Sequence, residues 1–147
     1  MKALKLFEEF IKEGIVKRVK IDRERAKSLL KESERRIHSL KERLEKLGIN
    51  NENANDYVEY CYDIIMHLVR AKLYLDGYNA SGFGAHEAEV SYMRGLGFNE
   101  RDVQFADQLR FFRNGILYYG TSLDVKYAEK VVEFTKRIYP KLKEMIK

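Results

Sequence analysis

The sequence predicts an all-α protein: an antiparallel up-and-down bundle of four long helices plus one or two short ones. Apolar residues recur at alternating spacings of four and three residues in four long segments, which is the periodicity of helices with one buried face. Short polar or glycine-containing loops join these segments, and short connections make consecutive helices antiparallel. Val, Ile and Thr never alternate at period two for long enough to indicate a sheet.

The first part of the chain predicts a short helix and then a long one. Residues 1–20 begin as an amphipathic helix that is broken at Gly14. The next segment, residues 26–47, has Asp22 before it as a candidate N-cap and Gly48 after it as a helix-ending glycine. We therefore expect an N-terminal helix with its connection, followed by the first long helix of the bundle.

The remaining segments follow in order along the chain. Residues 57–78 repeat the four-three spacing, and residues 85–94 form a shorter amphipathic piece between glycine-containing loops. Asn99 is placed to cap the next helix. Residues 128–145 repeat the pattern once more, with Pro140 inside the predicted helix, where it removes one backbone donor and should cause a local bend.

Length and composition predict one domain, residues 1–147, in a reducing environment. With 147 residues, of which 45% are hydrophobic, the chain can bury a core. The single Cys61 excludes an internal disulfide framework. Acidic residues near the N-terminus interrupt what would be the apolar run of a signal peptide, and no apolar run approaches the roughly 18 residues of a membrane span. We therefore expect a cytoplasmic protein with no membrane segment.

The net charge of +5 is concentrated in one region. Residues 17–47 contain twelve Lys or Arg against six Asp or Glu, and a local basic surface is typical of phosphate contacts to nucleic acid. The candidates for such contacts are Lys31, Arg35, Arg36 and Arg43. Because glutamates alternate with these bases at helical spacing, an ion-paired, solvated face is the alternative. No aromatic residue interleaves with them, so base stacking is not indicated there.

Neither a metal nor a cofactor is expected. His38, His67 and His86 do not form a motif with metal-ligand spacing, and the glycines fit no phosphate-binding loop. Cys61 lies on a predicted core stripe and is therefore expected to be a buried, inert thiol.

The helix expected after Asn99 has two unusual faces. One stripe is apolar or aromatic and predicts a core face, formed by Phe105, Leu109, Phe112, Ile116 and Tyr119. The opposite side mixes an amide, a guanidinium, a carboxylate and a phenol, on Val103, Asp107, Arg110, Asn114 and Tyr118. Such a mixture predicts a second half-buried contact, such as a subunit interface with a polar cleft. The alternative is an ordinary surface with an Asp107–Arg110 pair.

Within this helix Arg113 and Asn114 precede Tyr118, and the helix ends in Tyr119-Gly120. The arrangement resembles the signature helix of HEPN domains, the higher-eukaryote and prokaryote nucleotide-binding family. That signature has an Arg, then a polar residue, then a His slightly more than one helical turn later. Tyr118 stands here in place of the His. The resemblance extends from the helix at residues 26–47 to the C-terminal helix.

The resemblance implies a homodimer in which the Val103–Tyr118 helices of two subunits face each other across an RNA-binding cleft. Arg113 would stabilise the negative charge of a phosphate and Asn114 would position it, with Asp107, Arg110 and Tyr119 in support. In the family, the His exchanges the proton during metal-independent RNA cleavage. A phenol ordinarily titrates near pH 10 and is a weak base at neutral pH, so Tyr118 is a poor substitute.

We therefore expect a catalytically degenerate HEPN-like protein. It would act as a dimeric module for nucleotide, RNA or protein binding, paired with a minimal nucleotidyltransferase in a toxin–antitoxin-like system. Such a partner could also modify Tyr118 or Tyr119. One alternative is an active metal-independent ribonuclease that uses Tyr118 or recruits His67 or His86. The other is a purely structural helical interaction protein.

Overall fold

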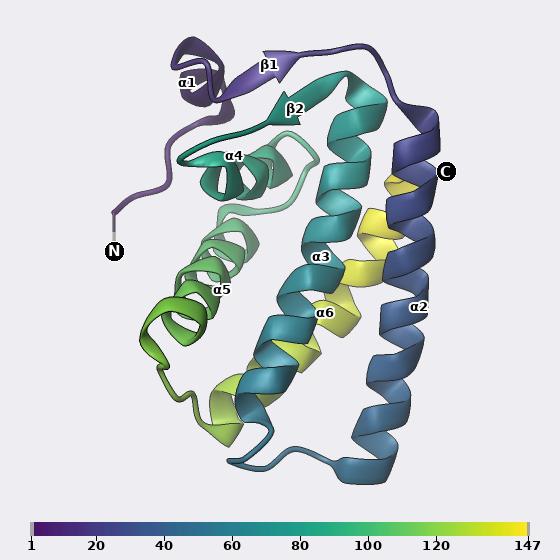
Figure 1. Cartoon of the computed structure of the whole chain (residues 1–147), viewed down its shortest axis with the longest axis vertical. Helices are drawn as coiled ribbons and strands as arrows, with labels where there is room; N and C mark the ends of the chain where they lie inside the picture. Colours follow the sequence, from purple (N-terminus) through teal and green to yellow (C-terminus); the bar gives the residue numbers. More distant parts are fainter. Residues whose placement is uncertain (1, 147) are drawn as a thin grey trace.

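Four long helices dominate the computed structural model, which describes residues 2–146 (Figure 1). The all-α bundle predicted from the sequence is confirmed. The elements in chain order are α1 (Phe7–Lys12), β1 (Val16–Arg18), α2 (Arg23–Leu47), α3 (Ala54–Asp76), β2 (Tyr78–Ala80), α4 (Ala85–Ser91), the 3-10 turn η1 (Tyr92–Arg94), α5 (Glu100–Tyr119) and α6 (Val125–Ile146).

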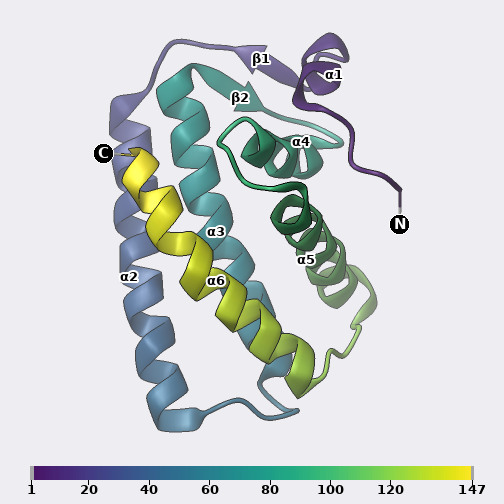
Figure 2. The same ribbon diagram turned by 180° about the vertical axis from the view of Figure 1, so that it is seen from behind.

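Helix α3 lies at the centre of the bundle. Helices α2 and α6 pack along most of its length, whereas α5 contacts it over a shorter stretch (Figures 1 and 2). Consecutive long helices run in opposite directions, as predicted. The chain order therefore makes α3 and α6 run in the same direction, with α6 crossing behind α3 in the view of Figure 1.

The central position of α3 follows from its side chains, which are apolar on most of its circumference. Residues spaced by three and four, including Cys61, Ile64 and Leu68, are fully buried against α2 and α6. Burial raises the pKa of the Cys61 thiol to about 12. A hydrogen bond with the Thr135 side chain lowers this pKa, but by less than burial raises it. The prediction of an inert core thiol is confirmed.

The helix ends follow the capping residues predicted from the sequence. The Asp22 carboxylate accepts a hydrogen bond from the Arg25 amide at 2.9 Å, and the Asn99 side chain accepts one from the Asp102 amide at 2.8 Å. Both bonds satisfy amide donors that the first turn of a helix leaves free. Helix α6 continues through Pro140, whose side chain is exposed to solvent.

A two-stranded antiparallel sheet was not predicted. Strand β1 pairs with β2, with Val16 opposite Ala80. Each strand has three residues, too few to show a period-two pattern. The helix expected to reach Tyr78 ends at Asp76, because Gly77 adopts a left-handed conformation with φ +81°. A Cβ at this glycine would lie 3.1 Å from the Val19 carbonyl oxygen, so the turn into β2 favours glycine.

Candidate phosphate-binding face and the signature helix

The two halves of α5 are covered to different extents. Up to Arg110 the helix has buried residues on the side that faces α3 and α4, and from Phe111 to Tyr119 it has none. The predicted division of α5 into a core stripe and an opposite face is therefore wrong in part. Val103, placed on the opposite face, is fully buried, whereas Tyr119, placed in the core stripe, is 85% exposed.

The physical reason is that α5 is packed on two sides. Phe105 and Phe112 of the predicted core stripe are only half-buried and contact α6: Phe105 lies 4.5 Å from Phe134 and Phe112 lies 5.0 Å from Tyr127, measured between ring centroids. The fully buried side lies between this stripe and the predicted polar face. A hydrophobic pattern alone does not show which side of such a helix its neighbours cover.

Asp107 and Arg110 belong to the interior of the chain. The Arg110 Nε atom donates to Asp107 Oδ1 at 2.8 Å. Arg110 is 9% exposed and Asp107 is 1% exposed. A second carboxylate, on Glu87 of α4, lies 3.7 Å from Arg110. The expectation that this pair belongs to a subunit interface or a surface is corrected: it joins α5 to the body of the protein.

Arg113 makes a contact that the sequence did not predict. Its guanidinium lies 3.3 Å from a carboxylate oxygen of Asp63, on α3, and 5.3 Å from the centroid of the Tyr62 ring. The Arg113 Nε atom is buried without a hydrogen-bond partner among residues 2–146. Arg113 is therefore held against α3 by one carboxylate and one ring, with a donor still unsatisfied.

Arg36, on α2, approaches the same carboxylate from the other side. Its guanidinium lies 3.6 Å from Asp63 and 3.1 Å from Glu32. Arg35 also pairs with Glu32, at 2.7 Å, and hydrogen bonds from these two arginines lower the pKa of the Glu32 carboxyl to about 2. The predicted basic face is therefore partly ion-paired, which agrees in part with the alternative of an ion-paired, solvated face.

The other predicted basic residues lie along the same helix. Arg43 and Arg36 each place a guanidinium 5.5 Å from the centroid of the Tyr60 ring of α3. An aromatic ring thus does accompany the bases, although it comes from the neighbouring helix and not from the segment itself. Lys31 is exposed, and its ammonium makes no ion pair among the described residues.

A row of half-buried polar residues on α3, which we call the open face, connects these arginines. The open face consists of Glu59, Asp63, His67 and Arg70. In Figure 1, α2 and α5 lie to either side of α3. The Nδ1 atom of His67 is hydrogen-bonded to the backbone oxygen of Asp63, one turn earlier. Sequence analysis missed Asp63 as a site residue; its spacing of four residues from His67 on one helix face was the available signal.

The remaining signature residues are not gathered around Arg113. Tyr118 is 74% exposed, and the five steps along the helix from Arg113 to Tyr118 turn it by about 140° beyond one full turn. Asn114 is half-buried. Within one chain, the structure brings Arg113 to Asp63 on α3 and leaves Tyr118 on another side of α5.

The last turns of α5 carry exposed apolar and aromatic side chains. Leu117 and Phe111 are each 48% exposed, and Tyr118 and Tyr119 are more exposed still. Most large apolar residues of the chain are buried, so their concentration on one helix end is a candidate contact surface.

The described residues 2–146 contain no group of three or more side chains able to hold a metal ion, and none of their helices is long and apolar enough to cross a membrane. Comparison with known proteins adds no relative: no family model, no curated protein and no solved structure matches the chain. The function proposed below is therefore argued from the contacts of Arg113, Arg36 and Asp63 and from the exposed end of α5.

Proposed function

We propose that this protein is a HEPN-like RNA-binding module that acts as a homodimer and does not cleave RNA. The observation that carries the proposal is the meeting of Arg113 and Arg36 at Asp63, at 3.3 and 3.6 Å, from opposite sides of α3. Two guanidinium groups from helices far apart in sequence converge on a half-exposed position, the geometry that a phosphate group requires.

The charges at this position favour an anion. Arg113, Arg36 and Arg35 are paired with two carboxylates, those of Asp63 and Glu32, which leaves one positive charge in excess in this cluster of ion pairs. Arg43 and the exposed Lys31 extend the positive charge along α2. A phosphate can replace the Asp63 carboxylate as the partner of either arginine, and binding then releases counterions from the nucleic acid.

The test is RNA binding measured by fluorescence anisotropy over a range of salt concentrations. Arg113→Ala and Arg36→Ala should each weaken binding and reduce the slope of log affinity against log salt by about 0.7, the value for one lost phosphate contact to a single strand. Arg25→Ala, on α2 near its N-terminus with its guanidinium 4.8 Å from the Tyr74 ring, is a control away from Asp63. Equal effects from all three variants would contradict a site at Asp63.

Dimerisation is supported by the exposed side chains at the end of α5, chiefly Leu117, Tyr118 and Tyr119. A second copy that paired with this surface would bury them and would bring two copies of Arg113 toward a shared cleft, as the family resemblance implies. Because a two-fold interface presents the same residue from both subunits, one added charge appears there twice. The proposed interface is therefore the C-terminal half of α5, without Val103, Asp107 and Arg110.

The position of Tyr118, the residue that stands in place of the family's His, argues against cleavage. A metal-independent ribonuclease needs a group that exchanges a proton near neutral pH, and Tyr118 lies on another side of α5. RNA incubated with the wild-type protein in EDTA should remain intact under conditions in which it is bound. A nucleotidyltransferase partner stays a prediction of the family resemblance.

A second candidate function, metal-independent cleavage of RNA, is favoured by the position of His67. Its Nδ1 atom is hydrogen-bonded to the Asp63 carbonyl oxygen, so in the neutral ring Nδ1 carries the proton and Nε2 is left as an acceptor. His67 also lies one turn from the carboxylate that Arg113 contacts. Cleavage in EDTA that is lost in His67→Gln, with RNA binding retained, would establish this function in place of the first.

A further inference from the structure

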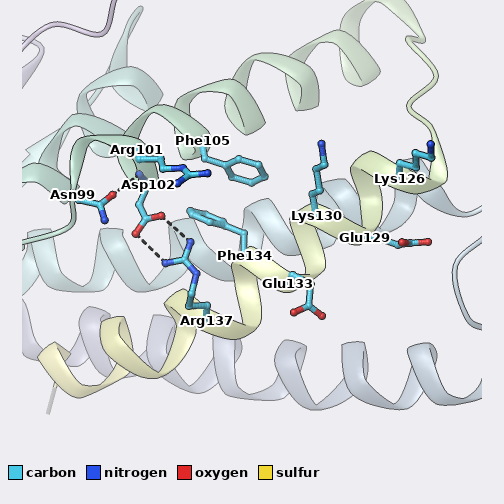
Figure 3. A pocket seen from close by; sticks show the side chains of 10 residues that line it. All are labelled: Asn99, Arg101, Asp102, Phe105, Lys126, Glu129, Lys130, Glu133, Phe134 and Arg137. Atoms are coloured by element: carbon cyan, nitrogen blue, oxygen red, sulfur yellow. Dashed lines mark hydrogen bonds and ion pairs between the residues drawn. The ribbon is translucent and has the colours of Figure 1, made fainter.

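A groove lies between the N-terminal half of α5 and residues 126–137 of α6 (Figure 3). Figure 2 shows these two helices on the side of α3 where α6 lies. The volume of the groove is about 820 Å³, within the range of roughly 300–1,000 Å³ typical of ligand sites. We call it the α5–α6 groove; it is lined by Asn99, Arg101, Asp102, Phe105, Lys126, Glu129, Lys130, Glu133, Phe134 and Arg137.

Two aromatic rings lie side by side in this groove. The centroids of Phe105 and Phe134 are 4.5 Å apart, and Tyr127 continues the row with its centroid 6.2 Å from that of Phe105. Phe134 is buried, but Phe105 is only half-buried and keeps part of its ring at the groove. The groove therefore offers an accessible aromatic ring that neighbouring rings hold in place.

Unpaired cations surround the rings. Arg101, Lys126 and Lys130 are exposed and make no ion pair with any of residues 2–146. Figure 3 shows Lys126 and Lys130 pointing from α6 toward α5, and Arg101 beside the Phe105 ring, whereas the Glu133 carboxylate points away from α5. Glu129 and Glu133 also line the groove. Apart from Asp102 and Arg137, the charged residues that line the groove are three cations and two carboxylates, which leaves one positive charge in excess.

One of the three acidic residues that line the groove, Asp102, is already neutralised. Arg137 donates two hydrogen bonds to Asp102, at 3.0 and 2.7 Å, and its guanidinium lies 5.5 Å from the centroid of the Phe134 ring. The hydrogen bond from Arg137 is the main cause that lowers the pKa of the Asp102 carboxyl. This pair forms a fixed wall of the groove, and the charge of the rest is set by three cations, Arg101, Lys126 and Lys130, against the carboxylates of Glu129 and Glu133.

We propose that the α5–α6 groove binds single-stranded RNA, with a base stacked on Phe105 and the adjoining phosphates held by Lys126, Lys130 and Arg101. An aromatic ring combined with basic side chains along an open groove is the arrangement that binds single strands without base pairing. Lys126 and Lys130 are one turn apart, about 6 Å along α6, so they present two successive positive charges on one side. The groove uses none of the residues at Asp63 and is a second contact, independent of that site.

The first test uses charge reversal with a control on the same helix. Binding of a fluorescein-labelled oligouridine, followed by anisotropy, should weaken in Lys130→Glu and in Lys126→Glu, with the salt slope reduced by about 0.7 for each. Lys136→Glu changes the net charge equally but lies on the exposed side of α6 outside the groove, and it should have a much smaller effect. Equal loss in Lys130→Glu and Lys136→Glu would overturn the proposal, because it would reveal only a response to net charge.

The second test addresses the ring. Phe105→Leu retains an apolar side chain but removes the stacking surface, and it should weaken oligouridine binding about fivefold or more. Phe83→Leu, at a fully exposed position of the loop before α4, is the control. Crosslinking of RNA that contains 4-thiouridine should label peptides of α5 and α6 near Phe105. Unchanged affinity in Phe105→Leu, or displacement of the RNA by polyglutamate of matched charge, would overturn the proposal.

The experiments test the site at Asp63 and the α5–α6 groove independently. If Arg113→Ala weakens binding while Lys130→Glu matches its control, the groove is not an RNA site and the proposal at Asp63 stands. If the opposite is found, the groove binds RNA and the site at Asp63 does not.

Discussion

The two halves of α5 have similar residue types and different environments. In the N-terminal half Arg110 is almost fully buried, with Asp107 on the same helix as its partner. In the C-terminal half Arg113, less than one turn later, contacts Asp63 of another helix at the edge of the open face. The difference shows that the neighbours which cover an arginine of α5 decide whether it stabilises the fold or stays available to a ligand.

Physical chemistry explains why the partners differ. A buried guanidinium without a partner is costly, so Arg110 requires the adjacent carboxylate of Asp107 as part of the fold. Arg113 retains some contact with solvent, where a charge pair contributes little to stability. Its carboxylate partner can therefore be exchanged for a ligand at small cost, which is a property of a binding residue.

The largest expected effect is on the buried pair. Arg110→Met should lower the free energy of unfolding by about 3–5 kcal/mol, because it leaves the Asp107 carboxylate buried without its partner. Urea denaturation followed by circular dichroism measures the change. The double variant Asp107→Leu/Arg110→Met should recover much of the loss, and a loss below about 1 kcal/mol in the single variant would show that Arg110 is as replaceable as a surface residue.

Truncation of leucines should separate the core from the end of α5. Leu68→Ala, at a fully buried position of α3, should cost about 2–5 kcal/mol of unfolding free energy. Leu117→Ala, at a half-exposed position, should stay within about 0.5 kcal/mol at protein concentrations low enough to give the monomer. Similar losses in the two variants would mean that the C-terminal half of α5 is packed as firmly as the core.

The ion pair between α5 and α6 predicts a pH dependence. Arg137 holds the pKa of Asp102 below its ordinary value of 3.8, so the stabilisation is complete above about pH 5 and disappears as the pH falls through the lowered pKa. Arg137→Gln should lose roughly 1 kcal/mol at pH 7, a modest value because half of the arginine side chain is exposed. The difference from wild type should shrink toward pH 2, and a constant difference between pH 7 and pH 2 would exclude this pair as its source.

The smallest effect on stability and the largest on assembly is expected at Tyr118. Tyr118→Glu should change the unfolding free energy of the monomer by less than about 0.5 kcal/mol. It should shift a dimer to a monomer in size exclusion with light scattering, because two carboxylates would then face each other across the interface. Gln108→Glu, at an exposed position of the buried half of α5, is the matched control. A wild-type protein that is monomeric at all concentrations would remove the basis for a shared cleft.

Much of the fold could be predicted from the sequence because its signals are local. The four-three spacing located the long helices, and Asp22 and Asn99 marked two of their starts through hydrogen bonds within one turn. The strands β1 and β2 were missed because three residues are too few to show a periodicity. The helix expected to reach Tyr78 stops earlier because Gly77 turns the chain into β2.

The candidate site was predicted less well because its contacts are long-range. Arg113 was identified from its neighbours in sequence, but its partner Asp63 lies 50 residues earlier, on a different helix. Asp107 and Arg110 were assigned to a half-buried interface with a polar cleft because of the mixture of residue types on their face, and the structure buries them as a pair within one chain. Which side of an amphipathic helix is covered depends on the positions of its neighbours, and these are set by the packing of the whole bundle.

The most direct test of the proposed site is a double-mutant cycle on Asp63 and Arg113, with RNA affinity as the measurement. Asp63→Asn keeps the shape of the side chain and removes the carboxylate that Arg113 and Arg36 share, while Arg36 keeps Glu32 as a partner. It should therefore tighten RNA binding, and most of the gain should be lost in Asp63→Asn/Arg113→Ala. Weaker or unchanged binding in Asp63→Asn, or an equal gain with and without Arg113, would contradict the account of Arg113 as a phosphate-binding residue held in place by Asp63.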